Sequence, residues 1–382
     1  MISDSPHRNF AAGLVLGMAV MLGLVSQLPW TPLLVERLTG LITGDRQGPA
    51  SASHGNVHGT SGYEYYVVGN PADVARPTQP GLVLMGGGDD IDECFEWMIE
   101  RSGGGDFLVL RTSGTDAYNA YLYDMTTAGG VKPDSVATMI VGTREAAFDP
   151  FVLDAIARAE ALWIAGGDQA KHVRCWQGTP VLKAIEAAVA RGVPVGGTSS
   201  GLDVLGEFLF SSENDTDAMN NLSSQDALGD PFHSQITLVR NFLNLPQLGG
   251  IILECHFVQH DRMGRLVTFL GRILENGWTS DARGIGIQSN TALLVEPDGS
   301  ARIVAGPDAT TPAAYFLRIA KDSSSCRAGE PLVARLVTVD QVRPGESFSL
   351  LTWMGSQMVS FSLAASEGVL DSSHGSQAVY PE

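Results

Sequence analysis

A serine enclosed by small residues stands at the centre of the segment PVGGTSSGLDVLGEF, which begins at Pro194. Gly197 and Gly201 bracket Ser199 as in the G-x-S-x-G turn, which exposes a nucleophilic serine at the sharp junction of a strand and a helix. In such a turn the backbone N–H of Ser200, at the helix N-terminus, points toward a developing oxyanion. Serine is also a favoured helix N-cap, so the segment by itself is equally consistent with a capping residue.

A histidine follows another apolar run, in the segment GGIILECHFVQHDRMGRL. His256 stands at the carboxyl end of the predicted strand. Small-molecule sites in parallel sheets lie at the carboxyl ends of strands, so we expect His256 on the same edge of the sheet as Ser199. Within hydrogen-bonding distance it could remove the serine proton as a general base. The alternative interpretation is a histidine buried in the core.

A Ser-His pair usually has an acid as its third member. The polar segment between the two residues offers four carboxylates at Glu213, Asp215, Asp217 and Asp226. Further along the chain, Arg262 and Arg265 are three residues apart and share one face of a predicted helix. Two guanidinium groups beside a catalytic histidine could hold a substrate carboxylate. The alternative is a pair of surface arginines whose alkyl stems cover apolar neighbours.

Two glycine-rich loops follow other apolar runs. The loop MGGGDD could bring a second backbone N–H to the oxyanion through Gly87 or Gly88. The loop IAGGDQ ends in Asp168 and Gln169, and the glutamine could bind a substrate amide or carboxylate. Neither loop has a phosphate-binding or dinucleotide-binding spacing. Taken singly, both are ordinary strand-to-helix turns.

These candidate residues need a scaffold, and the pattern of the chain predicts one. The apolar runs GLVLMGGG, DFLVLR, VATMIV and ALWIAGG alternate with helix-like stretches, among them residues 90–101 and 150–160. Such alternation is typical of an α/β fold with a mostly parallel sheet and helices on both faces. Past residue 284 the pattern changes to antiparallel hairpins with a Pro-Asp-Gly turn, and residues 331–382 indicate a β-rich C-terminal extension with a tail.

Composition limits the class of function. The chain has 382 residues, of which 44% are hydrophobic, enough for one large or two modest domains. A formal net charge of −18 argues against a nucleic-acid partner, because binding nucleic acid requires a dense Lys/Arg surface. An acidic surface is compatible with cationic or zwitterionic substrates. The four cysteines form no CxxC pair and predict no metal site; a disulfide remains an alternative in an exported protein.

An uncharged apolar run, residues 10–29, stands near the N-terminus. It is long enough to cross a bilayer as a helix and longer than the apolar region of a typical signal peptide. No small-x-small cleavage site follows at the usual distance, so we expect an uncleaved anchor with the rest of the chain exported. A cleaved signal peptide and a buried core helix are the alternatives. A Gly/Ser/His-rich tether follows at residues 43–62.

Taken together, these segments resemble the cyanophycinase branch of peptidase family S51, whose other branch is the aspartyl dipeptidase, peptidase E. The motifs GGGDD, IAGGDQ, GGTSSG, ECHFVQHDRMGRL and GIGIQSNTALLV occur in the family's order between about residues 81 and 351. The resemblance implies a three-layer α/β/α fold related to class I glutamine amidotransferases. From the resemblance together with the N-terminal apolar run and the tether, we expect a signal peptide or anchor (1–30), a linker (31–62), a catalytic domain (63–310) and a β-rich extension (311–382).

The resemblance also implies roles. Ser199 is the nucleophile and His256 the catalytic histidine, with no metal or organic cofactor. The third member falls shortly after the turn helix, which favours Asp215 or Asp217, whereas Asp226 fits if an insertion precedes it. The positions associated with holding the substrate are Asp168, Gln169, Glu254, Arg262 and Arg265. The chain departs from the family pattern where Ser200 replaces alanine, Glu254 replaces the commoner aspartate and His260 replaces a frequent arginine.

In cyanophycinases the substrate is multi-L-arginyl-poly-L-aspartate, which is cut to β-Asp-Arg dipeptides. We therefore expect a serine exopeptidase that acts on aspartyl peptide bonds outside the cytoplasm, with a second copy of the chain as a candidate partner. The alternatives are a membrane-tethered peptide-binding protein that has lost the chemistry, and an aspartyl dipeptidase with another substrate. Nucleophilic use of Cys255 is disfavoured, because neighbouring residues on a strand point to opposite faces.

Overall fold

A computed structural model describes residues 55–215 and 222–381 of the chain. All of these described residues belong to one compact unit. The predicted apolar helix at residues 10–29 lies outside the described residues, as does most of the predicted linker. Within the described part of the chain, no helix combines the length and the apolar character needed to cross a membrane.

The first of two sheets has eleven strands, and its five central strands are parallel. Buried parallel strands need apolar residues on both faces, and four of the five are the short apolar runs of the sequence, while the fifth, β7, leads into Ser199. The spatial order is β1 (Gly55–His58), β2 (Tyr63–Gly69), β5 (Ser135–Val141), β4 (Asp106–Arg111), β6 (Ala161–Ile164), β7 (Val195–Thr198), β3 (Leu82–Met85), β12 (Thr291–Val295), β13 (Ser300–Ala305), β17 (Ser347–Ser349) and β18 (Met354–Ser356).

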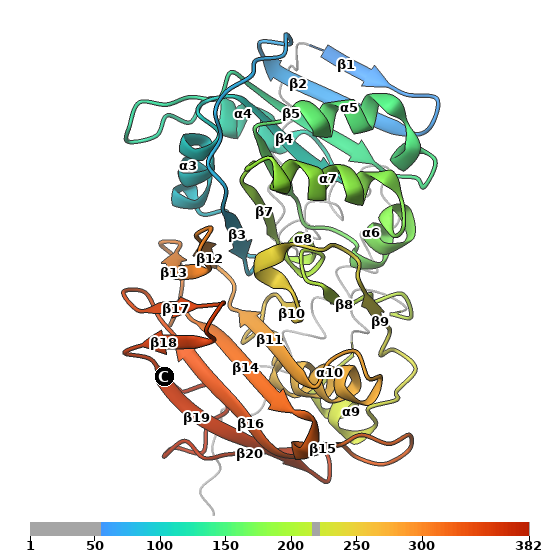
Figure 1. Ribbon diagram of the computed structural model, residues 1–382, viewed down its shortest axis with the longest axis vertical. Coiled ribbons are helices and arrows are strands. Elements are labelled where there is room, and N and C mark those ends of the chain that lie inside the picture. Colours follow the sequence, from blue (N-terminus) through green and yellow to red (C-terminus); the bar gives the residue numbers. More distant parts are fainter. Residues whose placement is uncertain (1–54, 216–221, 382) are drawn as a thin grey trace, which may run out of the picture. The chain divides into compact units, whose positions relative to one another are not determined.

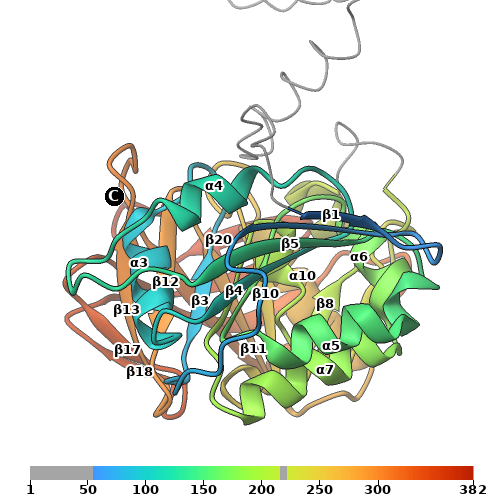
Figure 2. The same ribbon diagram turned by 90° about the horizontal axis from the view of Figure 1, so that it is seen from above.

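Helices cover both faces of the parallel strands. Alternate residues of a strand point to opposite faces, so Leu84 of β3 joins the core cluster that contains α5 (Pro150–Arg158) and α7 (Pro180–Ala190). Its neighbour Met85 joins the cluster of α3 (Asp92–Arg101) and α4 (Ala117–Tyr123). Figure 2 shows α5 and α7 on one side of β4 and β5, with α4 on the other. The predicted mixed α/β fold is confirmed.

A second sheet holds nine strands, and β8, β10 and β11 run parallel within it. The helices α9 (Ser224–Gly229) and α10 (Met263–Glu275) contribute apolar residues to its core cluster. The spatial order is β20 (Val369–Ser372), β19 (Val359–Ser366), β16 (Val333–Val342), β14 (Ala314–Ala320), β11 (Asp281–Ile287), β10 (Ile251–Glu254), β8 (Phe208–Phe210) and β9 (Leu238–Arg240), while β15 (Ser324–Ser325) pairs with β16.

The chain passes repeatedly from one sheet to the other (Figure 1). It leaves the first sheet after β7 through α8 (Ser200–Asp203), enters the second at β8, and returns at β12. The strands beyond residue 310 complete both sheets, because β17 and β18 join the first and the others join the second. The expectation that Ser199 and His256 share one edge of a single sheet needs correction: β7 and β10 belong to different sheets.

Candidate active site

Ser199 occupies a strained turn between β7 and α8. Its φ is 53° and its ψ is −128°, a left-handed conformation that is uncommon for a residue with a side chain. A Cβ on Gly197 would lie 2.3 Å from the carbonyl oxygen of Gly201, and one on Gly201 would lie 2.1 Å from that of Ile164. Both glycines are therefore required by close backbone approach, and the turn holds Ser199 at the carboxyl end of β7.

His256 meets this serine from the second sheet. It follows β10 with a φ of 43°, and its backbone N–H donates to the carbonyl oxygen of Gly86 at 2.8 Å. The distance from Ser199 Oγ to His256 Nε2 is 3.0 Å. This distance allows the hydroxyl to donate to a neutral imidazole, which is the arrangement of a nucleophile and its general base.

The surroundings of His256 keep its ring uncharged. Burial lowers the pKa of His256 to about 3, and the positive charges of Arg262, His260 and Arg265 act in the same direction. Because the imidazole is neutral at physiological pH, Nε2 can accept a proton. The same positive neighbours disfavour the imidazolium that would form during proton transfer.

The other ring nitrogen of His256 contacts a hydroxyl. His256 Nδ1 lies 2.8 Å from Ser289 Oγ, in the turn between β11 and β12, and the Ser289 N–H donates to Gln259 Oε1 at 3.0 Å. Sequence analysis missed Ser289, although its motif contributed to the family resemblance. The available signal was its place directly after a buried strand, where functional side chains gather.

The acids predicted for this position lie elsewhere or outside the described residues. Asp215 accepts a hydrogen bond from Gln235 Nε2 at 3.1 Å, and Asp226 accepts one from the Ser223 hydroxyl at 2.6 Å. Asp217 lies outside the described residues. The structure thus gives the described candidates local partners and brings a serine to the imidazole instead.

The backbone amides predicted to contact an oxyanion lie next to Ser199 and His256. Ser200 is the first residue of α8, so its N–H has no acceptor within the helix. A Cβ on Gly87, where φ is 88°, would lie 2.2 Å from His256 Cε1, so this loop runs directly against the imidazole. The hydrogen bonds found among residues 55–215 and 222–381 include none from the amides of Gly87, Gly88 or Ser200.

The two arginines predicted to hold a substrate bind a buried carboxylate instead. Arg265 Nε donates to Glu254 Oε2 at 3.0 Å, and Arg262 Nη1 donates to Glu254 Oε1 at 3.1 Å. The side chains of Arg265 and Glu254 are only 4% and 2% exposed. The predicted substrate contact of these residues is replaced by an internal ion pair, because helix spacing identifies a shared face but not what that face meets.

A buried aspartate that sequence analysis missed links the turn helix to β10. Asp203 accepts the backbone N–H of Cys255 at 2.9 Å and its thiol at 3.0 Å. Burial, followed by the nearby Glu254 charge, raises the pKa of Asp203 to about 7. Burial and Asp203 also raise the pKa of the Cys255 thiol well above its usual value, so the thiol stays neutral. Asp203 therefore fixes the backbone that leads into His256.

The loop after β6 lies beside the nucleophile, but its polar residues have structural partners. Asp168 caps α6 (Gln169–Trp176) by accepting the Lys171 N–H at 3.1 Å, and it pairs with Arg174 at 3.2 Å. Gln169 Nε2 donates to the carbonyl oxygen of Phe210. The predicted role of these two residues in holding the substrate is therefore not visible in the described contacts.

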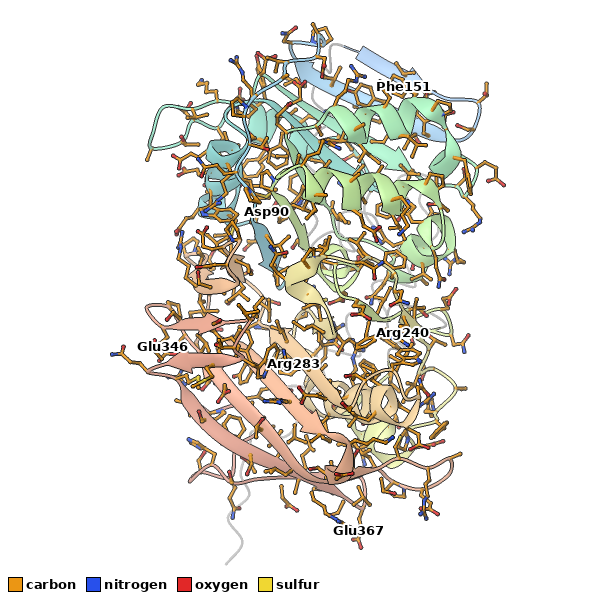
Figure 3. The ribbon with its side chains drawn as sticks, viewed as in Figure 1. Asp90, Phe151, Arg240, Arg283, Glu346 and Glu367 are labelled. Atoms are coloured by element: carbon orange, nitrogen blue, oxygen red, sulfur yellow. The ribbon has the colours of Figure 1, made fainter. Side chains whose placement is uncertain are left out.

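An acidic cavity opens next to the Gly86–Gly88 loop. It has a volume of about 360 Å³, and its lining includes Asn290 and the N-terminal residues of α3. Figure 3 labels Asp90, one of the lining residues, close to β3. The acidic residues that line the cavity are Asp89, Asp90, Asp92, Glu93 and Asp308. Their charge favours a cationic group beside the oxyanion loop.

Comparison with known proteins places Ser199 and His256 within a segment that matches a peptidase family. Residues 111–303, just over half of the chain, match the profile of peptidase family S51. The chain is 26% identical over 233 residues to the cyanophycinases of Synechococcus elongatus and Thermosynechococcus vestitus. Each match covers 59% of this chain and 65% of the relative, so the alignment spans slightly less than two thirds of those proteins.

A solved structure is also similar. The crystal structure of a peptidase from an acI-B1 Actinobacterium aligns with a TM-score of 0.45 and 17% identity, covering 72% of this chain and 98% of that protein. The match to the sequence profile, which extends from the end of β4 to β13 and includes both Ser199 and His256, identifies the family. The chain belongs to peptidase family S51.

Proposed function

We propose that this chain is a serine peptidase that hydrolyses a peptide bond through an acyl-enzyme on Ser199. The observation that carries the proposal is the 3.0 Å contact between Ser199 Oγ and His256 Nε2, at a turn whose backbone strain has no other evident use. Strain of this kind is kept where the surrounding structure enforces it for a functional purpose.

The mechanism follows from the positions of these groups. Ser199 Oγ attacks the carbonyl carbon while its proton moves to His256 Nε2. The amides of Ser200 and Gly87 donate to the oxygen that becomes negative. When the tetrahedral intermediate collapses, the imidazolium gives its proton to the departing amine, and water releases the acyl group by the same steps in reverse order.

The proposed substrate is an aspartyl peptide that carries basic side chains, as in the polymer cut by cyanophycinases. The curated relatives with that name support this choice, and so does the acidic cavity beside the Gly86–Gly88 loop. A guanidinium group entering that cavity would meet unlike charge close to the reacting carbonyl. The proposal includes exopeptidase action, in which residues are removed from a peptide end. It also includes a relationship between this fold and that of class I glutamine amidotransferases.

A peptide-binding protein without catalysis is the second candidate. The observation that favours it is the hydroxyl on His256 Nδ1, where a catalytic triad normally has a carboxylate. An aspartyl dipeptidase with a different substrate is a variant of the first proposal. It would use the same mechanism, and only its reaction products would distinguish it from an enzyme that cuts cyanophycin.

Product analysis tests the proposal. The full chain is incubated with cyanophycin and with α- and β-aspartyl dipeptides, and released products are followed by mass spectrometry. We expect β-Asp-Arg, and we expect Ser199→Ala to reduce kcat by at least about 10³-fold. Ser376→Ala, at an exposed position, is the matched control. Equal turnover by Ser199→Ala would refute the nucleophile, while binding without turnover favours the second candidate.

We further propose that residues 10–29 anchor the chain in a membrane and that the S51 domain is exported, because the run is uncharged and long enough to span a bilayer. Cell fractionation and the intact mass of the purified protein test this. A soluble chain of full mass in the cytoplasmic fraction contradicts it, and a chain shortened near residue 30 identifies a cleaved signal instead.

A further inference from the structure

The imidazole of His256 has hydrogen-bond partners on both nitrogens, and both partners are hydroxyl groups. Ser199 Oγ lies 3.0 Å from Nε2 and Ser289 Oγ lies 2.8 Å from Nδ1. The groups that lower the pKa of the ring electrostatically are the two arginines Arg262 and Arg265 together with His260, whose own pKa is lowered by burial. Among the contacts of the described residues, no carboxylate oxygen is hydrogen-bonded to this imidazole.

This arrangement leaves the tautomer of His256 weakly determined. To accept the Ser199 proton at Nε2, the ring must carry its own proton on Nδ1 and donate it to Ser289 Oγ. A hydroxyl can donate as well as accept, whereas an ionised carboxylate only accepts. Ser289 therefore supports the active tautomer and also the inactive one, in which Nε2 carries the proton.

A hydroxyl also gives less help to the charged ring. During attack the proton moves from Ser199 Oγ to Nε2, while the Nδ1 proton stays in its hydrogen bond to Ser289. The nearby anion Glu254 is engaged by Arg262 and Arg265 and does not bind the ring, whereas the carboxylate of a Ser-His-Asp triad stabilises the resulting imidazolium directly.

We infer that Ser289 is the positioning residue for His256 and that its lack of charge limits the rate of the acyl-transfer step. This inference rests on the proposed function, because it assigns a part in the same reaction. It has a consequence for engineering: a carboxylate at position 289 should select the productive tautomer and speed the reaction. Ser289 is half-buried, so a charged side chain at this position keeps access to water.

Three variants of the full chain test the inference, namely Ser289→Asp, Ser289→Asn and Ser289→Ala. Asparagine has the shape of aspartate without its charge, so it is the matched control. The first readout is ¹⁵N NMR of histidine-labelled protein, which reports the tautomer and titration of each ring; the chain has eight histidines, and His256→Gln assigns the signal. The second readout is kcat and KM as functions of pH.

We expect Ser289→Asp to place the proton on Nδ1 and to raise the pKa of His256 by at least about one unit, because an anion favours the charged ring. Its kcat should rise at least about tenfold over the wild type at neutral pH. Ser289→Asn lacks the charge, so it should raise neither the pKa of His256 nor kcat above the wild-type values. Ser289→Ala should lower kcat several-fold, on the order of 3- to 10-fold, with KM unaltered.

The two readouts separate failure of this inference from failure of the proposed function. If Ser289→Asp titrates and turns over like Ser289→Asn, the inference is overturned. If Ser289→Asp shifts the tautomer and pKa of His256 while all chains, the wild type included, hydrolyse nothing, Ser289 positions the ring as inferred and the proposed peptidase function is refuted.

Discussion

Ser200 shows how two atoms of one residue can have opposite energetic effects. Its backbone N–H is placed for catalysis, but its Oγ is buried without a hydrogen-bond partner among the described residues. A buried hydroxyl that makes no hydrogen bond retains its desolvation cost. Alanine at this position would remove that cost and keep the N–H.

We therefore expect Ser200→Ala to raise the free energy of unfolding by about 1 kcal/mol. Urea denaturation followed by circular dichroism measures the difference, with Ser376→Ala as an exposed control. A loss of stability on replacing Ser200 would show that the hydroxyl has a bound partner, such as an ordered water.

The sequence predicted the reacting pair better than its supporting residues. Ser199 and His256 carry distinctive side chains within recognisable segments, and the structure brings them together. Ser289 is missed because a serine has no chemical signature until the fold places it on a ring nitrogen. Arg265 was assigned to a substrate because i,i+3 spacing does not reveal that Glu254, on a neighbouring strand, occupies the facing position.

At the scale of elements, α8 and β10 are joined through one side chain. Asp203 of α8 accepts both the N–H and the thiol of Cys255, which directly follows β10. Because Ser199 precedes α8 and His256 follows Cys255, this contact helps to set the distance between Ser199 and His256.

Replacing Asp203 by alanine should lower the free energy of unfolding by about 3 kcal/mol, because it leaves a buried N–H and a cavity. Asp203→Asn keeps an acceptor for the N–H and should cost less than half of that. Urea denaturation of the two variants gives the comparison. Equal costs would mean that the carboxylate charge, and not the acceptor, is what matters.

The elements themselves were only partly predictable. The alternation of apolar runs and helices predicted the parallel strands of the first sheet, because that periodicity reports burial on both faces. The same alternation did not show that β8, β10 and β11 belong to a second sheet, because a short buried strand has the same apolar pattern in either sheet. Which strands pair depends on contacts between distant residues, such as Ile252 with Phe208 and Gly284.

The whole molecule should lose stability in mild acid. Burial lowers the pKa of His172 to about 4 and that of His256 to about 3, both below the ordinary 6.5. Between these values the unfolded chain therefore binds two protons that the folded chain does not bind. The stability that the two neutral histidines contribute is present above pH 6.5 and is lost as the pH falls toward 4. Asp203, with a pKa raised to about 7, takes up one proton in the folded state and opposes the loss.

Between about pH 6 and 4 these three groups leave a net difference of one proton, which corresponds to a slope of about 1.4 kcal/mol per pH unit. His172→Leu removes one of the two histidines and should bring that slope close to zero. Urea unfolding at several pH values measures both slopes. Parallel slopes for the two proteins would contradict the role of His172.

The two sheets should unfold as one cooperative unit. A chain that ends at residue 310 lacks β14, β15, β16, β19 and β20 from the second sheet and β17 and β18 from the first. We expect such a chain to show no cooperative thermal transition by circular dichroism, because β11 loses its antiparallel partner β14. A sharp transition in the truncated chain would show that residues 63–310 fold as an independent domain.

The crossing of the chain between sheets has a consequence for biosynthesis. The parallel strands that hold Ser199 are complete once Thr198 has left the ribosome. His256 depends on β10, which lies between β8 and β11, and β11 in turn pairs with β14, which ends at Ala320. A nascent chain therefore carries its nucleophile long before its base is in place. The contact between Ser199 and His256 can therefore form only after the ribosome has synthesised the strands up to residue 320.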